Sequence, residues 1–92
     1  MIKNLRTMTK IDFSKVEMPT IDGGKVIADF RQQLGNQLYM TGNDIEACEL
    51  GKRIYFSDGE MELSEKEVSI IKNMTATWSY IARTTLANLL DK

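Results

Sequence analysis

Residues 64 to 90 constrain the fold of this chain more than any other segment, because a marked helix start precedes a long apolar pattern. Ser64 and Glu67 have the S-x-x-E spacing of a capping box, in which the serine oxygen accepts a bond from an early helix amide and the glutamate reaches back to the serine amide. The apolar residues of the segment sweep roughly 200° when plotted at about 100° per residue. They are Val68, Ile70, Ile71, Met74, Trp78, Ile81, Ala82, Leu86, Leu89 and Leu90. The sequence therefore predicts a helical region that reaches Leu90.

A break in this region is predicted at Thr75-Ala76-Thr77. Threonine side chains compete with the backbone for hydrogen bonds and lose rotamer freedom in a helix. The sequence leaves open whether residues 65–90 form one helix or two.

An apolar arc of this width is larger than one packing face requires. One side of the helical region can pack on a small core, so we expect a second copy of the chain to cover the rest. Tryptophan is enriched at the centres of such contacts, which favours Trp78 as the central residue. The candidate interface residues are Ile71, Met74, Trp78, Ile81, Leu86, Leu89 and Leu90. The alternative is that Trp78 fills the core of its own chain.

The stretch FSDGEMELSEKE, which runs into this helix start, has a glycine among acidic residues and invites comparison with a calcium loop. With the obligatory glycine of such a loop at Gly59, apolar Ile54 and Phe56 fall at two of the four main ligand positions. Only Asp58 and Glu65 remain, whereas calcium takes about six to eight oxygen ligands. We therefore expect a turn and a short extended piece before the helix, and no metal site.

The first half of the chain combines strand and helix patterns. Imperfect alternation between Ile11 and Ile21 predicts one or two short strands, with Pro19 at an edge or a bend because proline cannot donate to a strand ladder. A glycine turn at residues 22–24 follows. Beyond it, helical spacing predicts one buried helix face, formed by Val26, Ile27, Phe30, Leu34 and Leu38.

Gly35 lies inside this helical pattern, where glycine costs about 1 kcal/mol relative to alanine, so a conformational role or a close packing contact would justify it. Asn43 and Glu46 have the N-x-x-E spacing of a helix start, and a second helix is expected from Asp44 to about Phe56. One side of that helix carries Ala47, Leu50, Gly51 and Ile54. These patterns predict a mainly helical α+β fold, in which a short amino-terminal strand or β-hairpin packs on three to four helices.

The residue types present disfavour most enzymatic chemistry. The chain has no histidine, which removes the commonest general base and metal ligand and with them most hydrolase, triad and zinc mechanisms. Cys48 stands alone among acidic neighbours and is expected to be a small hydrophobe. A solvated helix start explains the carboxylate pairs Glu60 with Glu62 and Glu65 with Glu67. We expect no enzymatic activity and no cofactor.

The chain has 92 residues, enough for one modest core. Residues 1–10 have no apolar period, so we expect a flexible leader followed by a single globular domain over residues 11–92. Whether Met1 or Met8 is the natural start is left open. No apolar run approaches the roughly 18 residues of a membrane span, and the amino end lacks the apolar stretch of a signal peptide, so a cytoplasmic location is expected.

A small nucleic-acid-associated regulator is the alternative function. The basic residues it would use as an oligomer are Lys3, Arg6, Lys10 and Lys15. A formal net charge of -1 supplies no overall attraction to phosphate. A helix-turn-helix register set on Ala47 and Gly51 places Ser57 where a buried aliphatic residue belongs and makes the reading helix acidic. Nucleic-acid binding is therefore the less favoured function.

Three stretches carry a resemblance to a known group of proteins. They are K-I-D-F-S at residues 10–14, the glycine turn leading into a helix, and I-Y-F-S-D-G-E-M-E-L-S-E-K-E at residues 54–67. In layout, and over most of its length, the chain resembles small uncharacterised proteins from gene clusters of tailed phages and prophages. The resemblance includes no chemical motif and implies a non-enzymatic role in particle assembly or in host and phage regulation. We therefore expect a homo-oligomeric interaction or assembly module, whose partners are copies of itself and an unknown protein.

Overall fold

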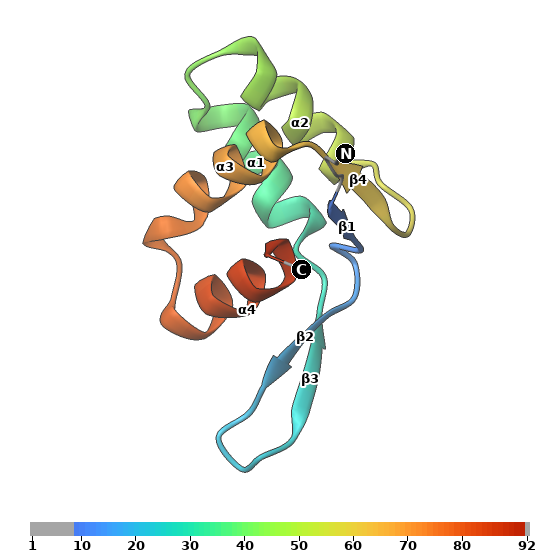
Figure 1. Ribbon diagram of the computed structural model, residues 1–92, viewed down its shortest axis with the longest axis vertical. Helices are drawn as coiled ribbons and strands as arrows, with labels where there is room; N and C mark the ends of the chain where they lie inside the picture. The colour runs from blue at the N-terminus through green and yellow to red at the C-terminus, as the bar shows by residue number, and fades with distance from the viewer. Residues whose placement is uncertain (1–8, 92) are drawn as a thin grey trace, which may run out of the picture.

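The computed structural model describes residues 9–91, and within them the mainly helical α+β class is confirmed. Four α-helices and one short 3-10 helix, η1, accompany four short strands in these residues (Figure 1). The order is β1 (Thr9–Ile11), β2 (Val16–Pro19), β3 (Lys25–Ala28), α1 (Arg31–Thr41), α2 (Ile45–Tyr55), β4 (Met61–Leu63), α3 (Glu65–Met74), η1 (Thr75–Thr77) and α4 (Tyr80–Leu90).

Strands β1 and β4 form a two-stranded antiparallel sheet from distant parts of the chain. Thr9 lies opposite Leu63, and Ile11 lies opposite Met61. The short extended piece predicted before the helix is therefore present as β4, and its Leu63 side chain is fully buried. Thr9 and Lys10 belong to β1, so the domain begins before Ile11; the rest of the expected leader, residues 1–8, lies outside the described residues.

Strands β2 and β3 form a hairpin that extends away from the helices (Figure 1). The Thr20 amide donates to the Gly24 carbonyl at 3.0 Å, and the Gly23 amide donates to the Thr20 carbonyl at 3.1 Å. Gly23 has φ = 91°, the left-handed conformation that closes a three-residue hairpin loop. The predicted glycine turn is thus a hairpin turn.

The predicted start of the first helix is wrong, because Val26 and Ile27 lie in β3 and α1 begins only at Arg31. Two adjacent β-branched residues favour the extended backbone, and the tight turn before them holds β3 against β2. The remaining part of the pattern is confirmed, since Phe30, Leu34 and Leu38 are buried.

Helices α1 and α2 pack directly on each other and touch at two glycines (Figure 1). A Cβ atom on Gly35 would lie 2.8 Å from the Gly51 carbonyl oxygen, and one on Gly51 would lie 2.7 Å from the Gly35 carbonyl oxygen. Both distances are well inside van der Waals contact, so the two backbones touch directly. Of the two reasons that could justify Gly35, the close packing contact is the one found.

The helix ends follow most of the predicted signals. Ser64 and Glu67 form the capping box: the Glu67 amide donates to Ser64 Oγ at 3.2 Å, and the Ser64 amide donates to Glu67 Oε1 at 2.9 Å. At α2 the N-cap is Asp44, whose carboxylate accepts from the Ala47 amide at 3.0 Å, one residue later than the predicted Asn43. The carboxyl-terminal region divides into α3 and α4 at η1, as the threonine pair predicts.

The core collects one apolar face from each of the four α-helices and from three of the strands. Its largest fully buried side chains are Phe13, Leu34, Leu38, Leu50, Ile54, Leu63, Ile71, Leu86 and Val16. The predicted apolar side of α2 is confirmed, because Ala47, Leu50, Gly51 and Ile54 are all buried. A chain of this size can build only one such core, so the surfaces that remain apolar lie outside it.

We expect Gly51→Ala to destabilise the fold by about 1–3 kcal/mol, because the added methyl group would collide with the backbone of α1. The sign of this change in unfolding free energy is informative, since the same substitution in an unconstrained helix would instead stabilise the fold by about 1 kcal/mol. The measurement is the free energy of unfolding in urea. Glu49→Ala on the exposed side of α2 is the control and should change it by less than about 0.5 kcal/mol. A Gly51→Ala chain at least as stable as the native one would show that the helices do not touch there.

Ser64→Ala should cost about 1 kcal/mol, because the Glu67 amide loses its acceptor at the start of α3. Chemical denaturation again gives the value. Ser69→Ala is the matched control, since Ser69 is exposed in the middle of the same helix. Equal denaturation midpoints for the two variants would mean that the Ser64 cap does not contribute to the stability of the fold.

Candidate interaction surfaces

The predicted carboxyl-terminal interface does not form one accessible face. Ile71, Leu86 and Leu90 lie in the core of the chain itself, with at most 3% of their surface exposed. The half-buried members of the set are Met74, Trp78 and Leu89, which pack against the core, and Ile81 is 43% exposed. Because the region divides into two helices, each half buries its own part of the wide apolar arc, and no second copy is needed to cover it. A contact between copies at this place would have to use Ile81 and its half-buried neighbours.

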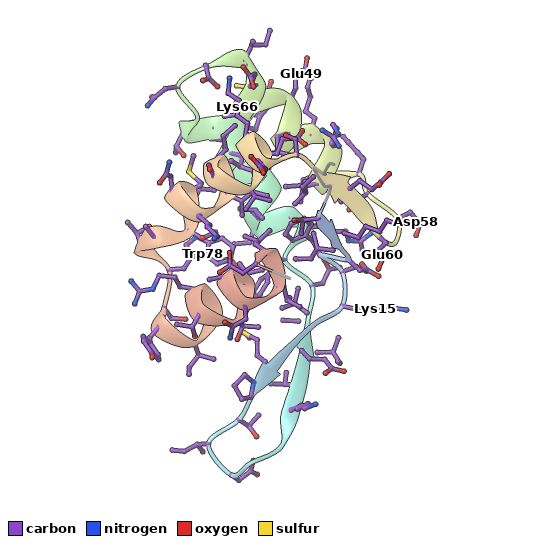
Figure 2. The ribbon with its side chains drawn as sticks, viewed as in Figure 1. Lys15, Glu49, Asp58, Glu60, Lys66 and Trp78 are labelled. Carbon is purple, nitrogen blue, oxygen red and sulfur yellow. The ribbon has the colours of Figure 1, made fainter. Side chains whose placement is uncertain are left out.

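Trp78 is held inside its own chain by a polar contact and by an aromatic one. Its ring meets the ring of Phe30 edge to face, with centroids 5.3 Å apart. Its indole Nε1 donates to Gln37 Oε1 at 2.6 Å, and Gln37 Nε2 donates to the Met74 carbonyl at 2.8 Å. Figure 2 shows Trp78 at the junction of α3 and α4. One side chain of α1 thus satisfies two polar groups at the bend between these helices.

The acidic turn between α2 and β4 points its carboxylates outward. Figure 2 shows Asp58 and Glu60 projecting from this turn, and Gly59 has φ = 99°. Glu67 is occupied by the capping box and by an ion pair with Arg53. Across residues 9–91, no three acidic or cysteine side chains gather closely enough to hold a metal ion.

Most cations of the described residues already face carboxylates. The ion pairs are Lys25 with Glu17, Arg31 with Asp29, Lys52 with Glu49, Arg53 with Glu67, Lys66 with Glu46, and Lys72 with Asp91. Of the basic residues named for nucleic-acid binding, Lys10 and Lys15 are exposed, whereas Lys3 and Arg6 lie outside the described residues. The segment after α2 is a turn and the strand β4, so the reading helix of a helix-turn-helix is not formed in that register.

A concave aromatic surface lies over the crossing of α1 and α2. It encloses about 330 Å³ and is lined by Gly35, Asn36, Tyr39, Gly51, Lys52, Tyr55 and Phe56. The rings of Tyr55 and Phe56 meet edge to face at 4.9 Å, and Phe56 is 77% exposed. The glycines form its floor because they lack side chains. This hollow can receive an apolar side chain from outside.

The β2–β3 hairpin carries the other concentration of exposed aliphatic residues. Ile21 at its tip is fully exposed, and Ile27 and Val26 on β3 are 57% and 44% exposed. Helix α4 packs against β2, but among the described residues β3 has no comparable neighbour other than β2. The side of β3 that faces away from β2 is therefore an open sheet edge.

The two edges of the hairpin differ in their hydrogen-bonding groups. Thr20 and Gly24 form a hydrogen-bonded pair, and such pairs alternate along an antiparallel ladder with pairs that are not bonded. Pro19 opposite Lys25, and Glu17 opposite Ile27, are therefore non-bonded pairs whose backbone groups point outward. On the β2 side Pro19 has no N–H to offer, whereas on the β3 side both Lys25 and Ile27 keep a donor and an acceptor.

Sequence reasoning missed this hairpin as a site, although a signal was present. A D-G-G turn flanked by V-E-M-P and K-V-I-A is a hairpin pattern, but the spacing of Val26 and Ile27 also fits the helix that follows. The aromatic hollow had no local signal, because its walls come from two helices.

Gln37→Ala should destabilise the fold by about 1–3 kcal/mol, because it leaves the Trp78 N–H and the Met74 carbonyl without their partner. Urea unfolding followed by tryptophan emission measures the loss. Gln33→Ala, at an exposed position of the same helix, should leave the midpoint nearly unchanged. If both variants unfold at the native midpoint, the bridge between α1 and the α3–α4 junction contributes nothing.

Comparison of the chain with protein families, with curated proteins and with solved structures gave no match. In the part of the chain that the structure describes, none of the helices is both long enough and apolar enough to cross a membrane.

Proposed function

We propose that this protein is a non-enzymatic interaction module that assembles with copies of itself through the β2–β3 hairpin. The observation that carries the proposal is the open edge of β3, whose outward backbone donors and acceptors have no partner within residues 9–91 and lie beside two exposed aliphatic side chains, Val26 and Ile27. An exposed edge strand of this kind is a template for pairing with another chain.

The physical reason for self-association is that an isolated two-stranded ribbon is only marginally stable in water. Three or more strands, or packing against a helix, give such a ribbon independent stability. Here α4 packs against β2, whereas β3 has no comparable helix contact within residues 9–91. A strand from a second copy would supply the missing support and would cover Ile27 and Val26.

A non-enzymatic role agrees with the surroundings of the acidic side chains. Glu60 and Glu62 are exposed, and Glu67 is committed to the helix cap and to Arg53. The chain contains no histidine for proton transfer near neutral pH. Particle assembly in a phage or mobile element is the setting implied by the layout resemblance and is part of the proposal. The cytoplasmic location, expected from the sequence, is part of it too. An unknown protein is the second proposed partner, and the aromatic hollow on α1 and α2 has the shape to take one of its side chains.

Static light scattering at about 100 µM should report a mass at least twice that of one chain. Ile27→Lys should lower the mass to that of a monomer, because it places a charge in the middle of the proposed contact. Ile21→Lys is the matched control: it makes the same change at a more exposed residue of the same hairpin, but outside the strand. The control should assemble like the native chain.

A native chain that is monomeric at this concentration would contradict the proposed function. Ile81→Lys distinguishes the hairpin from the carboxyl-terminal surface. If this variant becomes monomeric while Ile27→Lys still assembles, the contact lies on α4 and the hairpin is not the site.

A further inference from the structure

We infer that β3 pairs with β3 of a second copy in an antiparallel, two-fold arrangement, with Ile27 on the axis and Lys25 opposite Asp29 of the second copy. Two hairpins would then form one four-stranded sheet. The inference rests on the proposed self-association and specifies its geometry.

The outward backbone groups of β3 limit how two copies can pair. Gly24 is bonded to Thr20, and by the alternation of the ladder Val26 and Ala28 are bonded to β2, so Lys25 and Ile27 direct their N–H and C=O groups to the open side. Asp29 lies just beyond β3, and the following amide, that of Phe30, donates at 2.8 Å to the carbonyl of Phe13, which precedes β2, so we place the backbone groups of Asp29 on the open side as well. A new strand must therefore match Lys25, Ile27 and Asp29 with the same three residues of its own.

Five antiparallel registers satisfy this condition, and the side chains favour one of them. Centring on Lys25 or on Asp29 would put like charges directly opposite each other. The two intermediate registers would set Ile27 opposite a charged residue. Centring on Ile27 pairs isoleucine with isoleucine and pairs each Lys25 with an Asp29, and it is the only register that uses all three residues of both copies.

The side chains on both faces of the resulting sheet also fit the register centred on Ile27. Lys25, Ile27 and Glu17 share one face, as the ion pair between Lys25 and Glu17 at 3.5 Å indicates, so the central Ile27 pair would be flanked by charges. On the other face Val26 would meet Ala28 of the second copy. Both aliphatic side chains of β3 would thus lose water on pairing.

Both charged residues already have an ion-pair partner within the chain, but each remains exposed to solvent and can face a further charge. The Lys25 side chain is 71% exposed, and its pair with Glu17 is long and solvated. Asp29 is 47% exposed, and hydrogen bonds from the Arg31 side chain hold the pKa of its carboxyl below the ordinary value, so Asp29 is ionised at neutral pH. Lysine on an edge strand usually discourages pairing. Here it would exclude the wrong registers and favour the one in which it meets an aspartate.

A charge swap between two variants tests the register. Copies of Lys25→Asp alone would set two carboxylates opposite each other at both ends of the contact, and copies of Asp29→Lys alone would set two ammonium groups there. Each variant should therefore associate about tenfold more weakly than the native chain. An equimolar mixture restores both opposite-charge pairs in every mixed dimer, and native mass spectrometry should show the mixed dimer in excess over either homodimer. Lys15→Asp is the control, because it makes the same charge change beside the hairpin but outside β3, and it should dimerise like the native chain.

A cross-linking variant gives a second, independent measurement if Asp29→Lys fails to fold. In the proposed register Ile27 faces itself across the axis, at the roughly 5.5 Å Cα separation of a hydrogen-bonded pair, which is within disulfide range. In a Cys48→Ala background, Ile27→Cys should therefore oxidise to a covalent dimer, whereas Val26→Cys, which faces Ala28, should form far less.

The outcomes separate the two claims. If the native chain assembles but the mixture of charge variants shows no preference for the mixed dimer, or Val26→Cys cross-links as fast as Ile27→Cys, the register is wrong and the self-association stands. If the native chain is monomeric, the proposed function fails and the register fails with it.

Discussion

Direct backbone contact between α1 and α2 at Gly35 and Gly51 is the constraint on which the rest of the domain depends. Each glycine accommodates the carbonyl oxygen of the other, which brings the helices together without intervening side chains. This close approach lets Leu34 and Leu38 on one helix, and Leu50 and Ile54 on the other, point to the same core. Helix α3 packs against both helices of this pair, and α4 packs in turn against α3 and against the strands β1 and β2.

The contact also produces the aromatic hollow. Because no side chain fills the space over the two glycines, Tyr39, Tyr55 and Phe56 stand around a recess on the solvent side of the helix pair. The same missing side chains that permit tight packing below therefore leave an apolar depression above. A methyl group at either glycine would therefore disturb both the packing of the two helices and the shape of this surface.

Local features of the fold were predictable, and contacts between distant segments were not. The Ser64 capping box, the break at Thr75 and the buried side of α2 depend on residues within a few positions of one another, and the sequence shows them. The spacing of Val26 and Ile27 fits a helix as well as a strand, and these residues form a strand because the hairpin turn before them pairs them with β2. The pairing of β1 with β4, the meeting of Gly35 with Gly51 and the bridge from Gln37 to Trp78 join residues that no local pattern connects. For that reason the width of the apolar arc pointed to a second copy, although the chain buries most of it by itself.

Pro19 has a consequence for the size of any assembly that the hairpin makes. In a four-stranded sheet of two copies, both β3 strands lie in the centre and each outer border is a β2 strand. Pro19 withholds an N–H from that border, and α4 packs against the same strand. A third hairpin would find only the backbone groups of Glu17 on this edge, so the addition of further copies would be disfavoured after the first step. Pro19 on β2 would thus favour a dimer as the end state of the pairing that β3 makes possible.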